Sequence, residues 1–324
     1  MTNDINDIKL TDEEIKAFCT CNGMSDEQYE KLIRDGYSTD EIFKSAKEIV
    51  LRGESLADDC EFKPKLASEF TGRKTRFVWY PYIPIGDYTV LMADGVTGKT
   101  IFCCGILATM SNGRLLPGDR IKEAQKTLFI SAEDTGDKLH DILKASGADL
   151  DMIHILDCTE SEGLNFTDRA EEFKKLILQT RARLVIIDPW HAFLGADVDI
   201  NRVNAVRPVF QRLANIAKDC DCGLVLVSHV NKRAQGENAN NAATGSTDFV
   251  NAARSAMRVI FSEEPDGENC RIVVHTKSNY AQAGESVKFR INDKGGCVWA
   301  GFSEITRRTV EKEAGRGYIE PERG

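Results

Sequence analysis

The pattern of apolar and polar positions divides the chain into three stretches of different character. Residues 1–60 are polar, with short amphipathic segments. Two of these segments begin with a hydroxyl residue followed three positions later by Glu or Gln, at Thr11–Glu14 and Ser25–Gln28, a spacing that satisfies the free amides of a first helical turn. A third helix is expected to end at Gly53, because glycine favours helix termination. We therefore predict a helical appendage over residues 1–60, followed by a polar linker over 61–75.

From residue 76 onward, apolar runs typical of strands alternate with segments of helical periodicity. The strand-like runs are Tyr88–Met92, Thr127–Ser131, Met152–Leu156, Leu184–Ile187 and Leu224–Ser228. The helical segments between them are Lys99–Ser111, Thr135–Ser146, Asp168–Gln179 and one expected to begin at Pro208 and to end near Lys218. This alternation is typical of a mostly parallel sheet covered by helices on both faces.

After residue 256 the helical periodicity stops. Four further strands are predicted, over Met257–Phe261, Arg271–Thr276, Val287–Ile291 and Cys297–Phe302. The last two are joined by Asp-Lys-Gly-Gly at 293–296, a sequence typical of a hairpin turn. The predicted fold class is α/β: one domain over 76–302 with a mostly parallel central sheet and C-terminal antiparallel strands, preceded by the all-helical appendage. Residues 303–324 are polar and are expected to form a loose tail.

Composition narrows the class of protein. The chain of 324 residues is 42% hydrophobic and 29% charged, which is ordinary for a globular protein. No apolar run approaches the ~18 residues of a membrane-spanning helix, and the polar start, MTNDINDIKL, does not resemble a secretory signal. Ten cysteines lie at irregular spacings, so we expect reduced thiols in a cytoplasmic protein without a membrane segment. The net charge of −9 argues against non-specific coating of nucleic acid, so any such contact is expected from local loops.

The strongest candidate chemistry is a phosphate-binding loop between the first core strand and the helix that follows it. The segment Ala-Asp-Gly-Val-Thr-Gly-Lys-Thr matches the pattern G-x-x-x-x-G-K-[ST], with alanine at the first glycine position. Backbone amides and the positive end of the helix attract phosphates, the lysine reaches the terminal phosphates, and the threonine hydroxyl is placed to bind Mg²⁺. The expected nucleotide-binding residues are Ala93, Asp94, Gly95, Val96, Thr97, Gly98, Lys99 and Thr100.

Two acidic positions at the ends of later strands complete this prediction. Asp188 ends an unbroken apolar run, so in a parallel sheet it emerges beside the phosphate loop, where it can hold Mg²⁺ together with Thr100. Glu133 follows the strand at 127–131 and is our candidate for the catalytic carboxylate that orients and deprotonates the attacking water. The alternative for Asp188 is an acid that only solvates a strand end.

The order of these segments resembles RecA-type ATPases, most closely the branch of plasmid RepA-type hexameric replicative helicases and their phage relatives. The resemblance spans roughly residues 78–290 and leaves the N-terminal helices uncovered. Beyond the phosphate loop it is carried by Ser131–Asp134 (SAED), Ile186–Trp190 (IIDPW), Val227–Val230 (VSHV), Gly245–Asp248 (GSTD), Asn251–Arg254 (NAAR) and Thr276–Asn279 (TKSN). It implies a RecA-like P-loop NTPase core that binds ATP and Mg²⁺.

The resemblance also implies roles for three further residues. His229 is similar to the polar residue that senses the γ-phosphate, although a lone histidine is often only structural. Arg254 is similar to an arginine supplied in trans to the ATP of a neighbouring subunit, with Arg258 as a rival and a surface salt bridge as the alternative. Lys277 is a further in-trans candidate.

In RecA-like rings, the loops that correspond to residues 190–203 and 231–247 grip single-stranded DNA. The nucleic-acid candidates in these loops are Arg202, Lys232 and Arg233, whereas Trp190 and Phe193 are alternatively core residues. The resemblance thus implies a homo-oligomer, a hexamer in the branch named. The N-terminal helices lie outside the resemblance, and packing or contact with a protein partner is expected of them.

The function expected from the sequence is Mg²⁺-dependent ATP hydrolysis by a ring motor that acts as a DNA helicase or translocase in replication or recombination. One alternative is a recombination mediator or loader that does not unwind DNA. A weaker alternative is a P-loop small-molecule kinase, which needs a substrate lid with several arginines. The segment between Glu133 and Asp188 has only Arg169, Arg181 and Arg183.

Overall fold

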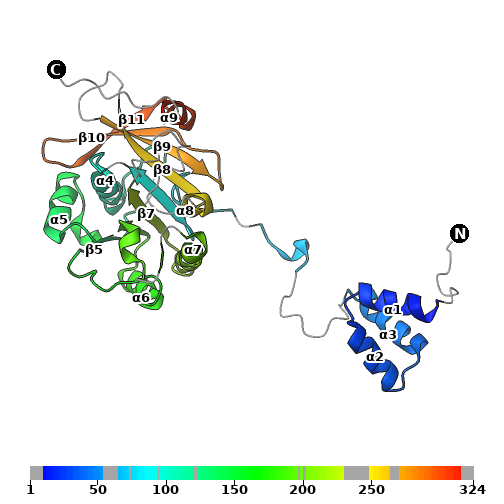
Figure 1. Cartoon of the computed structure of the whole chain (residues 1–324). Coiled ribbons are helices and arrows are strands. Elements are labelled where there is room, and N and C mark those ends of the chain that lie inside the picture. Colours follow the sequence, from blue (N-terminus) through cyan, green and yellow to red (C-terminus); the bar gives the residue numbers. More distant parts are fainter. Residues whose placement is uncertain are drawn as a thin grey trace. The chain divides into compact units, whose positions relative to one another are not determined.

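The computed structural model describes residues 10–53, 65–72, 74–93, 95–119, 123–195, 198–199, 202–229, 248–262 and 270–314. The chain divides into two compact units, Met1–Arg73 and Lys74–Gly324, which Figure 1 colours from blue onward along the sequence. No helix in these described ranges is long and apolar enough to cross a membrane.

The first unit consists of three short helices, each with a reciprocal capping box at its N-terminus. The helices are α1 (Asp12–Cys21), α2 (Asp26–Arg34) and α3 (Thr39–Leu51). The capping pairs are Thr11 with Glu14, Ser25 with Gln28, and Ser38 with Glu41. A small apolar cluster holds the helices together and consists of Ile15, Cys19, Tyr29, Ile42 and Ala46. A single turn of 3-10 helix, η2 (Ala67–Glu69), follows in the segment predicted as a linker.

The second unit contains a nine-stranded sheet with the order β11-β10-β9-β8-β3-β7-β6-β4-β5. Its strands are β3 (Tyr88–Ala93), β4 (Thr127–Ser131), β5 (Ile153–Leu156), β6 (Leu184–Asp188), β7 (Gly223–His229), β8 (Ser255–Phe261), β9 (Cys270–Ser278), β10 (Ser286–Ile291) and β11 (Cys297–Ser303). The six strands from β8 to β5 in this order are parallel, and β9, β10 and β11 pair antiparallel. The predicted fold class is therefore confirmed.

Helices cover both faces of this sheet (Figure 1). They are α4 (Lys99–Ser111), α5 (Gly136–Ala145), α6 (Ala170–Thr180), α7 (Val203–Asp219), α8 (Asp248–Ala252) and α9 (Arg307–Ala314), with 3-10 turns η3 (Leu150–Met152) and η4 (Trp190–Phe193). Alternate residues of β3 point to opposite faces, as a strand requires. Val90 and Met92 join the core beneath α6 and α7, whereas Leu91 joins the core beneath α4 and α5.

Two details differ from the sequence prediction. Helix α7 begins at Val203, so Pro208 lies inside it. A proline at this position removes one backbone hydrogen bond and crowds the carbonyl of Asn204, and the buried Val206, Val209 and Phe210 hold this turn against the core. The segment predicted as a loose tail contains helix α9, whose Val310 is buried on β9. One apolar residue among charged ones gave too little periodicity to predict it.

The aromatic segment before the core strands forms a small separate sheet, β1 (Phe77–Trp79) with β2 (Ile83–Pro84). Trp79 is fully buried among the residues beneath α4, and its indole Nε1 donates to the carbonyl of Pro117 at 2.9 Å. The Tyr82 hydroxyl donates to the carbonyl of Glu285 at 2.6 Å. These contacts place Trp79 and Tyr82 in the packed interior of the second unit.

Candidate functional site

The phosphate loop lies where the sequence predicts, between the carboxyl end of β3 and the first turn of α4. Ala93 is the last residue of β3, so the alanine in the first glycine position continues the strand and needs no left-handed backbone. Gly98 caps α4 with φ 85°, a conformation that favours glycine. Thr97 is buried, whereas Val96 points outward. Asp94 lies outside the described residues.

Lys99 is directed toward the end of β7. Its ammonium nitrogen lies 3.1 Å from Nδ1 of His229. Because an ammonium can only donate, Nδ1 accepts, and the neutral imidazole then carries its proton on Nε2. Burial and the adjacent Lys99 lower the pKa of His229, which favours this neutral form. Nε2 in turn faces Oε1 of Glu133 at 3.8 Å.

Thr100 contacts the predicted acid of β6. Its hydroxyl donates to Oδ2 of Asp188 at 3.1 Å. Asp188 is only 5% exposed, and burial raises the pKa of its carboxyl to about 6, although Lys99 and Thr100 both act to lower it. A hydroxyl and a carboxylate side by side are oxygen donors of the kind that Mg²⁺ prefers, so this pair fits the expected metal. The described residues contain no cluster of three or more His, Cys, Asp or Glu side chains that would hold a metal by itself.

The sheet register brings Glu133 to the same place. Ser131 pairs with Asp188 across β4 and β6, so the residues after Ser131 emerge beside the metal-binding candidate. The Ser131 hydroxyl accepts from the backbone amides of Glu133 at 3.3 Å and Asp134 at 2.8 Å, which fixes the turn. Asp134 forms an ion pair with Lys138, whereas Glu133 faces His229.

A second histidine, His191, lies beside His229. The sequence prediction included it only as part of the loop 190–203. His191 belongs to η4, and its ring centroid is 6.4 Å from that of His229. Its Nδ1 is buried and makes no hydrogen bond within the described residues, and burial lowers the pKa of its imidazole. The sequence signal for His191 was its position three residues after Asp188. Its contact with His229, however, depends on the neighbouring strand β7.

Arg254 lies at the opposite ends of the parallel strands, away from the phosphate loop. It precedes β8, whose Ser255 pairs with Thr89 near the start of β3, whereas the phosphate loop follows the other end of β3. With Arg207 and Tyr280 it lines a pocket of about 410 Å³. The rival Arg258 pairs with Met92 in the sheet register and is half-buried.

Lys277 lies at these same strand ends, because it pairs with Ala256 across β8 and β9. Its ammonium group donates to the carbonyls of Val250, at 3.2 Å, and Asn251, at the end of α8. Lys277 and Arg254 are thus both separated from the chain's own phosphate loop by the length of β3.

The nucleic-acid candidates are only partly described. Arg202 is 80% exposed and lies 3.3 Å from Asp199. Lys232, Arg233 and the whole of loop 231–247 lie outside the described residues. Trp190 and Phe193 are buried in the core beneath α7, which supports the structural alternative for both aromatic side chains.

Comparison with known proteins identifies one family. A family model described as an AAA domain matches residues 57–235, which is more than half of the chain. No curated protein matches the sequence. Among solved structures, the chain is similar to the crystal structure of the RadB recombinase, with a TM-score of 0.46 and 14% sequence identity over 66% of this chain and 90% of that one. The match over more than half of the chain shows that the protein belongs to the AAA domain family.

Proposed function

We propose that the protein hydrolyses ATP with Mg²⁺ and uses the energy to move along single-stranded DNA as a ring motor of the RepA-type helicase branch. One observation carries the proposal. Lys99, Thr100, Asp188, Glu133 and His229 come from four different strands or helix ends and converge at one edge of the sheet. Structural ion pairs alone do not require that convergence.

ATP binding would exchange partners within this cluster. The amides ahead of α4 and the ammonium of Lys99 bind the phosphates, and the phosphate oxygens replace His229 as the acceptor for Lys99. His229 is then released whenever a terminal phosphate is present. The hydrogen bond of 3.1 Å between the two side chains supports His229 as the residue that senses the γ-phosphate.

Mg²⁺ would be held by Thr100 and Asp188, and when bound it neutralises charge on the phosphate oxygens. Asp188 supports the proposal because its carboxyl is buried beside a hydroxyl and a lysine. A carboxylate in that position is costly for the fold even with Lys99 nearby, and a bound metal cation would offset that cost.

Glu133 is the proposed general base. It lies beside Asp188 through the strand register and faces the sensor histidine, whereas its neighbour Asp134 is paired with Lys138. A carboxylate with an open face is able to orient a water molecule toward the terminal phosphate and accept its proton. Asp134 is less suited, because its ion pair already occupies an oxygen.

Arg254 is proposed to act on the ATP of a neighbouring copy. Strand β3 rises ~3.3 Å per residue, so its two ends are roughly 17 Å apart and Arg254 is too distant from its own Lys99. A head-to-tail contact between copies would bring the two edges together, and such contacts close into a ring when the rotation from copy to copy closes. This supports an oligomer, for which the resemblance implies six subunits, with Lys277 as a second in-trans candidate.

DNA contact is proposed for loops 190–203 and 231–247, through Arg202, Lys232 and Arg233. Both loops follow strands whose ends carry the nucleotide cluster, β6 and β7, so a change at His229 or Asp188 has a short path to them. The N-terminal helices are proposed to bind a protein partner, since their sequence carries no catalytic pattern.

The test is to measure ATP turnover with and without single-stranded DNA, together with the native mass of the active species. DNA-stimulated turnover by a hexamer supports the proposal, and DNA-independent turnover by a monomer contradicts it. A strand-displacement assay on a forked duplex separates the motor from a loader. A helicase displaces the strand in proportion to ATP consumed, whereas a loader hydrolyses ATP and leaves the duplex intact.

A further inference from the structure

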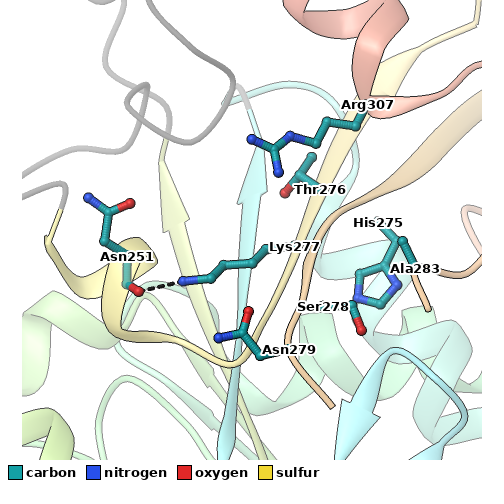
Figure 2. Close-up of a pocket in the computed structure, with 8 residues that line it drawn as sticks. All are labelled: Asn251, His275, Thr276, Lys277, Ser278, Asn279, Ala283 and Arg307. Carbon is teal, nitrogen blue, oxygen red and sulfur yellow. Dashed lines mark hydrogen bonds between the residues drawn. The ribbon is translucent and has the colours of Figure 1, made fainter. Parts of the chain in front are cut away.

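A pocket of about 460 Å³ lies beside α8, at the edge of the sheet away from the phosphate loop. Figure 2 shows side chains from α8, β9 and α9 around one space. Its lining residues are Asn251, His275, Thr276, Lys277, Ser278, Asn279, Ala283 and Arg307. Only Lys277 among them has a role in the function proposed above.

The charge of the pocket is one-sided. Among the described residues that line it, two are cationic, Lys277 and Arg307, and none is acidic. The whole chain, by contrast, has a net charge of −9. A cation pair without an acid in the lining attracts anions into the pocket and does not favour metal ions.

Arg307 belongs to a helix, α9, that carries positive side chains at its N-terminus, where the helix dipole is also positive. It is the first residue of α9, Arg308 follows it, and the first turn contains no acid. Positive side chains at a helix N-terminus are disfavoured by the helix dipole, and an anion beside them removes that penalty. Val310, one turn later, is buried against β9, so the side of α9 that carries Arg307 is fixed over this strand.

The neutral lining residues offer hydrogen bonds and no competing charge. Asn251 and Asn279 carry amide groups that are able to donate, and both residues flank Lys277 in Figure 2. The Nε2 atom of His275 lies 3.0 Å from the Ser255 hydroxyl, and its Nδ1 accepts from the backbone amide of Gly284 at 2.9 Å. Burial lowers its pKa to about 4, so it contributes structure and no positive charge at neutral pH.

Lys277 is held in place before any ligand arrives. Its ammonium donates to the last carbonyls of α8, those of Val250 and Asn251. A tethered cation loses less conformational entropy when it binds an anion than a freely moving lysine does. Arg307 adds a planar group able to make two parallel hydrogen bonds to one oxyanion.

We propose that this pocket is a second oxyanion site that binds a phosphate group through Arg307, Lys277 and Asn251. Because it lies at the far end of β3 from Lys99, the phosphate is not one that the chain's own phosphate loop holds. The phosphate belongs either to a nucleotide bound by another copy or to a nucleic-acid backbone. The site itself does not depend on ATP turnover.

The deciding experiment is a calorimetric titration of inorganic pyrophosphate into the full chain carrying Lys99→Ala, which weakens binding at the phosphate loop. Pyrophosphate is expected to bind, and adding Arg307→Gln is expected to weaken binding at least tenfold. Arg308→Gln is the matched control, since it removes the same charge from the adjacent position of α9 and does not line the pocket. Equal loss in both variants, or no loss with Arg307→Gln, overturns the proposal.

Two further arms identify the source of the phosphate, using chains with an intact phosphate loop. If it is a nucleotide on another copy, Arg307→Gln lowers ATP turnover, and mixing it with Lys99→Ala chains restores part of that turnover. If it is nucleic acid, Arg307→Gln weakens binding of an oligo-dT strand while DNA-free turnover is unchanged. Because pyrophosphate binding is measured without turnover, failure of the ATPase proposal leaves this test intact.

Discussion

The two ends of the parallel strands have opposite chemistry. The carboxyl ends, called the carboxyl edge below, carry one buried lysine, Lys99, next to the acids Glu133, Asp134 and Asp188. The opposite ends, which carry Arg254, Lys277 and Arg307, are called the amino edge. The amino ends of β3 and β8 carry arginines and a lysine around two pockets, with Asp87 as the one acid among the described lining residues. The first edge has the groups proposed to hold a nucleotide and its metal, and the second has cations whose charge suits phosphate groups.

Under the proposed function, this difference gives one copy two complementary halves of a site. Within a copy the halves are separated by the length of β3, so they are able to meet only between copies. A head-to-tail contact is the geometry that brings an acid-rich edge to a cation-rich edge repeatedly.

The largest expected effect follows from removing the lysine of the carboxyl edge. Lys99→Ala removes the cation that holds the terminal phosphates and should reduce ATP turnover by ~10³-fold or more. ATP binding should weaken as well, measured with a fluorescent nucleotide. Lys144→Ala, an exposed lysine in the last turn of α5, is the matched control and should leave both quantities unchanged.

Arg254→Ala tests the amino edge. If Arg254 acts on a neighbour's ATP, turnover should fall by ~10³-fold while ATP affinity stays within about twofold, because the arginine stabilises charge that develops during transfer. Mixing with Lys99→Ala chains should restore part of the turnover, since each variant supplies the half that the other lacks.

Arg258→Ala tests whether the in-trans role belongs to Arg254 or to its rival Arg258. Arg258 lies in the interior of β8, opposite Met92, and its loss should affect folding more than turnover per folded chain. Normal turnover in Arg254→Ala would assign the in-trans role elsewhere and remove the functional contrast between the edges.

The acid of the carboxyl edge gives a pH-dependent prediction about stability. Burial raises the pKa of Asp188 to about 6, above the ~3.9 of an unfolded aspartate. The folded chain therefore holds a proton that the unfolded chain releases between about pH 4 and 6, and stability falls as pH rises through this window. At pH 8 the charged, buried carboxylate costs about 3 kcal/mol.

Asp188→Asn should remove this cost in the nucleotide-free chain with a chelator present. The melting temperature of the variant should exceed that of the wild type by several degrees at pH 8, and the difference should shrink toward zero near pH 4. Turnover should be lost at every pH, because the amide is a poor metal ligand. Asp168→Asn, in an exposed loop, serves as the control; equal melting curves for Asp188→Asn and wild type at pH 8 would contradict the buried charge.

The carboxyl edge was predictable from sequence because its signals are local. The pattern around Gly98 and Lys99 and the apolar runs that end at Asp188 and Ser131 fix strand ends, and parallel strands place those ends together. The contact between Lys99 and His229 needed the sheet order, in which β7 lies between β3 and β6. No local pattern contains that order.

The amino edge was predicted less completely. Arg254 and Lys277 were identified by resemblance alone, and Arg307 was assigned to a loose tail. Its pocket is built from α8, β9 and α9, which lie more than 50 residues apart from first to last. Among the side chains of α9 that the structure describes, Val310 is the one buried against β9, and one apolar residue in a charged segment leaves no periodic signal.

The smallest expected effect concerns how the amino edge positions its arginine. The Tyr280 hydroxyl donates to Oδ2 of Asp87 at 2.7 Å, and Oδ1 of Asp87 accepts from the amide of Tyr88 at 2.8 Å. Arg254 lines the same pocket and interacts with the Tyr280 hydroxyl. Tyr280→Phe should therefore loosen Arg254 without removing it. We expect kcat to fall about two- to fivefold with KM unchanged, and the fold to lose about 1 kcal/mol.

Burial and the bond to Asp87 raise the pKa of Tyr280 to about 12, so the hydroxyl keeps its proton and the effect should be constant between pH 7 and 9. Tyr37→Phe, an exposed tyrosine of the first unit, is the control for removal of a phenol oxygen. A loss of turnover as large as that of Arg254→Ala would mean that Tyr280 itself contacts the neighbour's nucleotide. No loss would mean that Arg254 is positioned by the contact between copies, and the amino edge would then be assembled only when the ring closes.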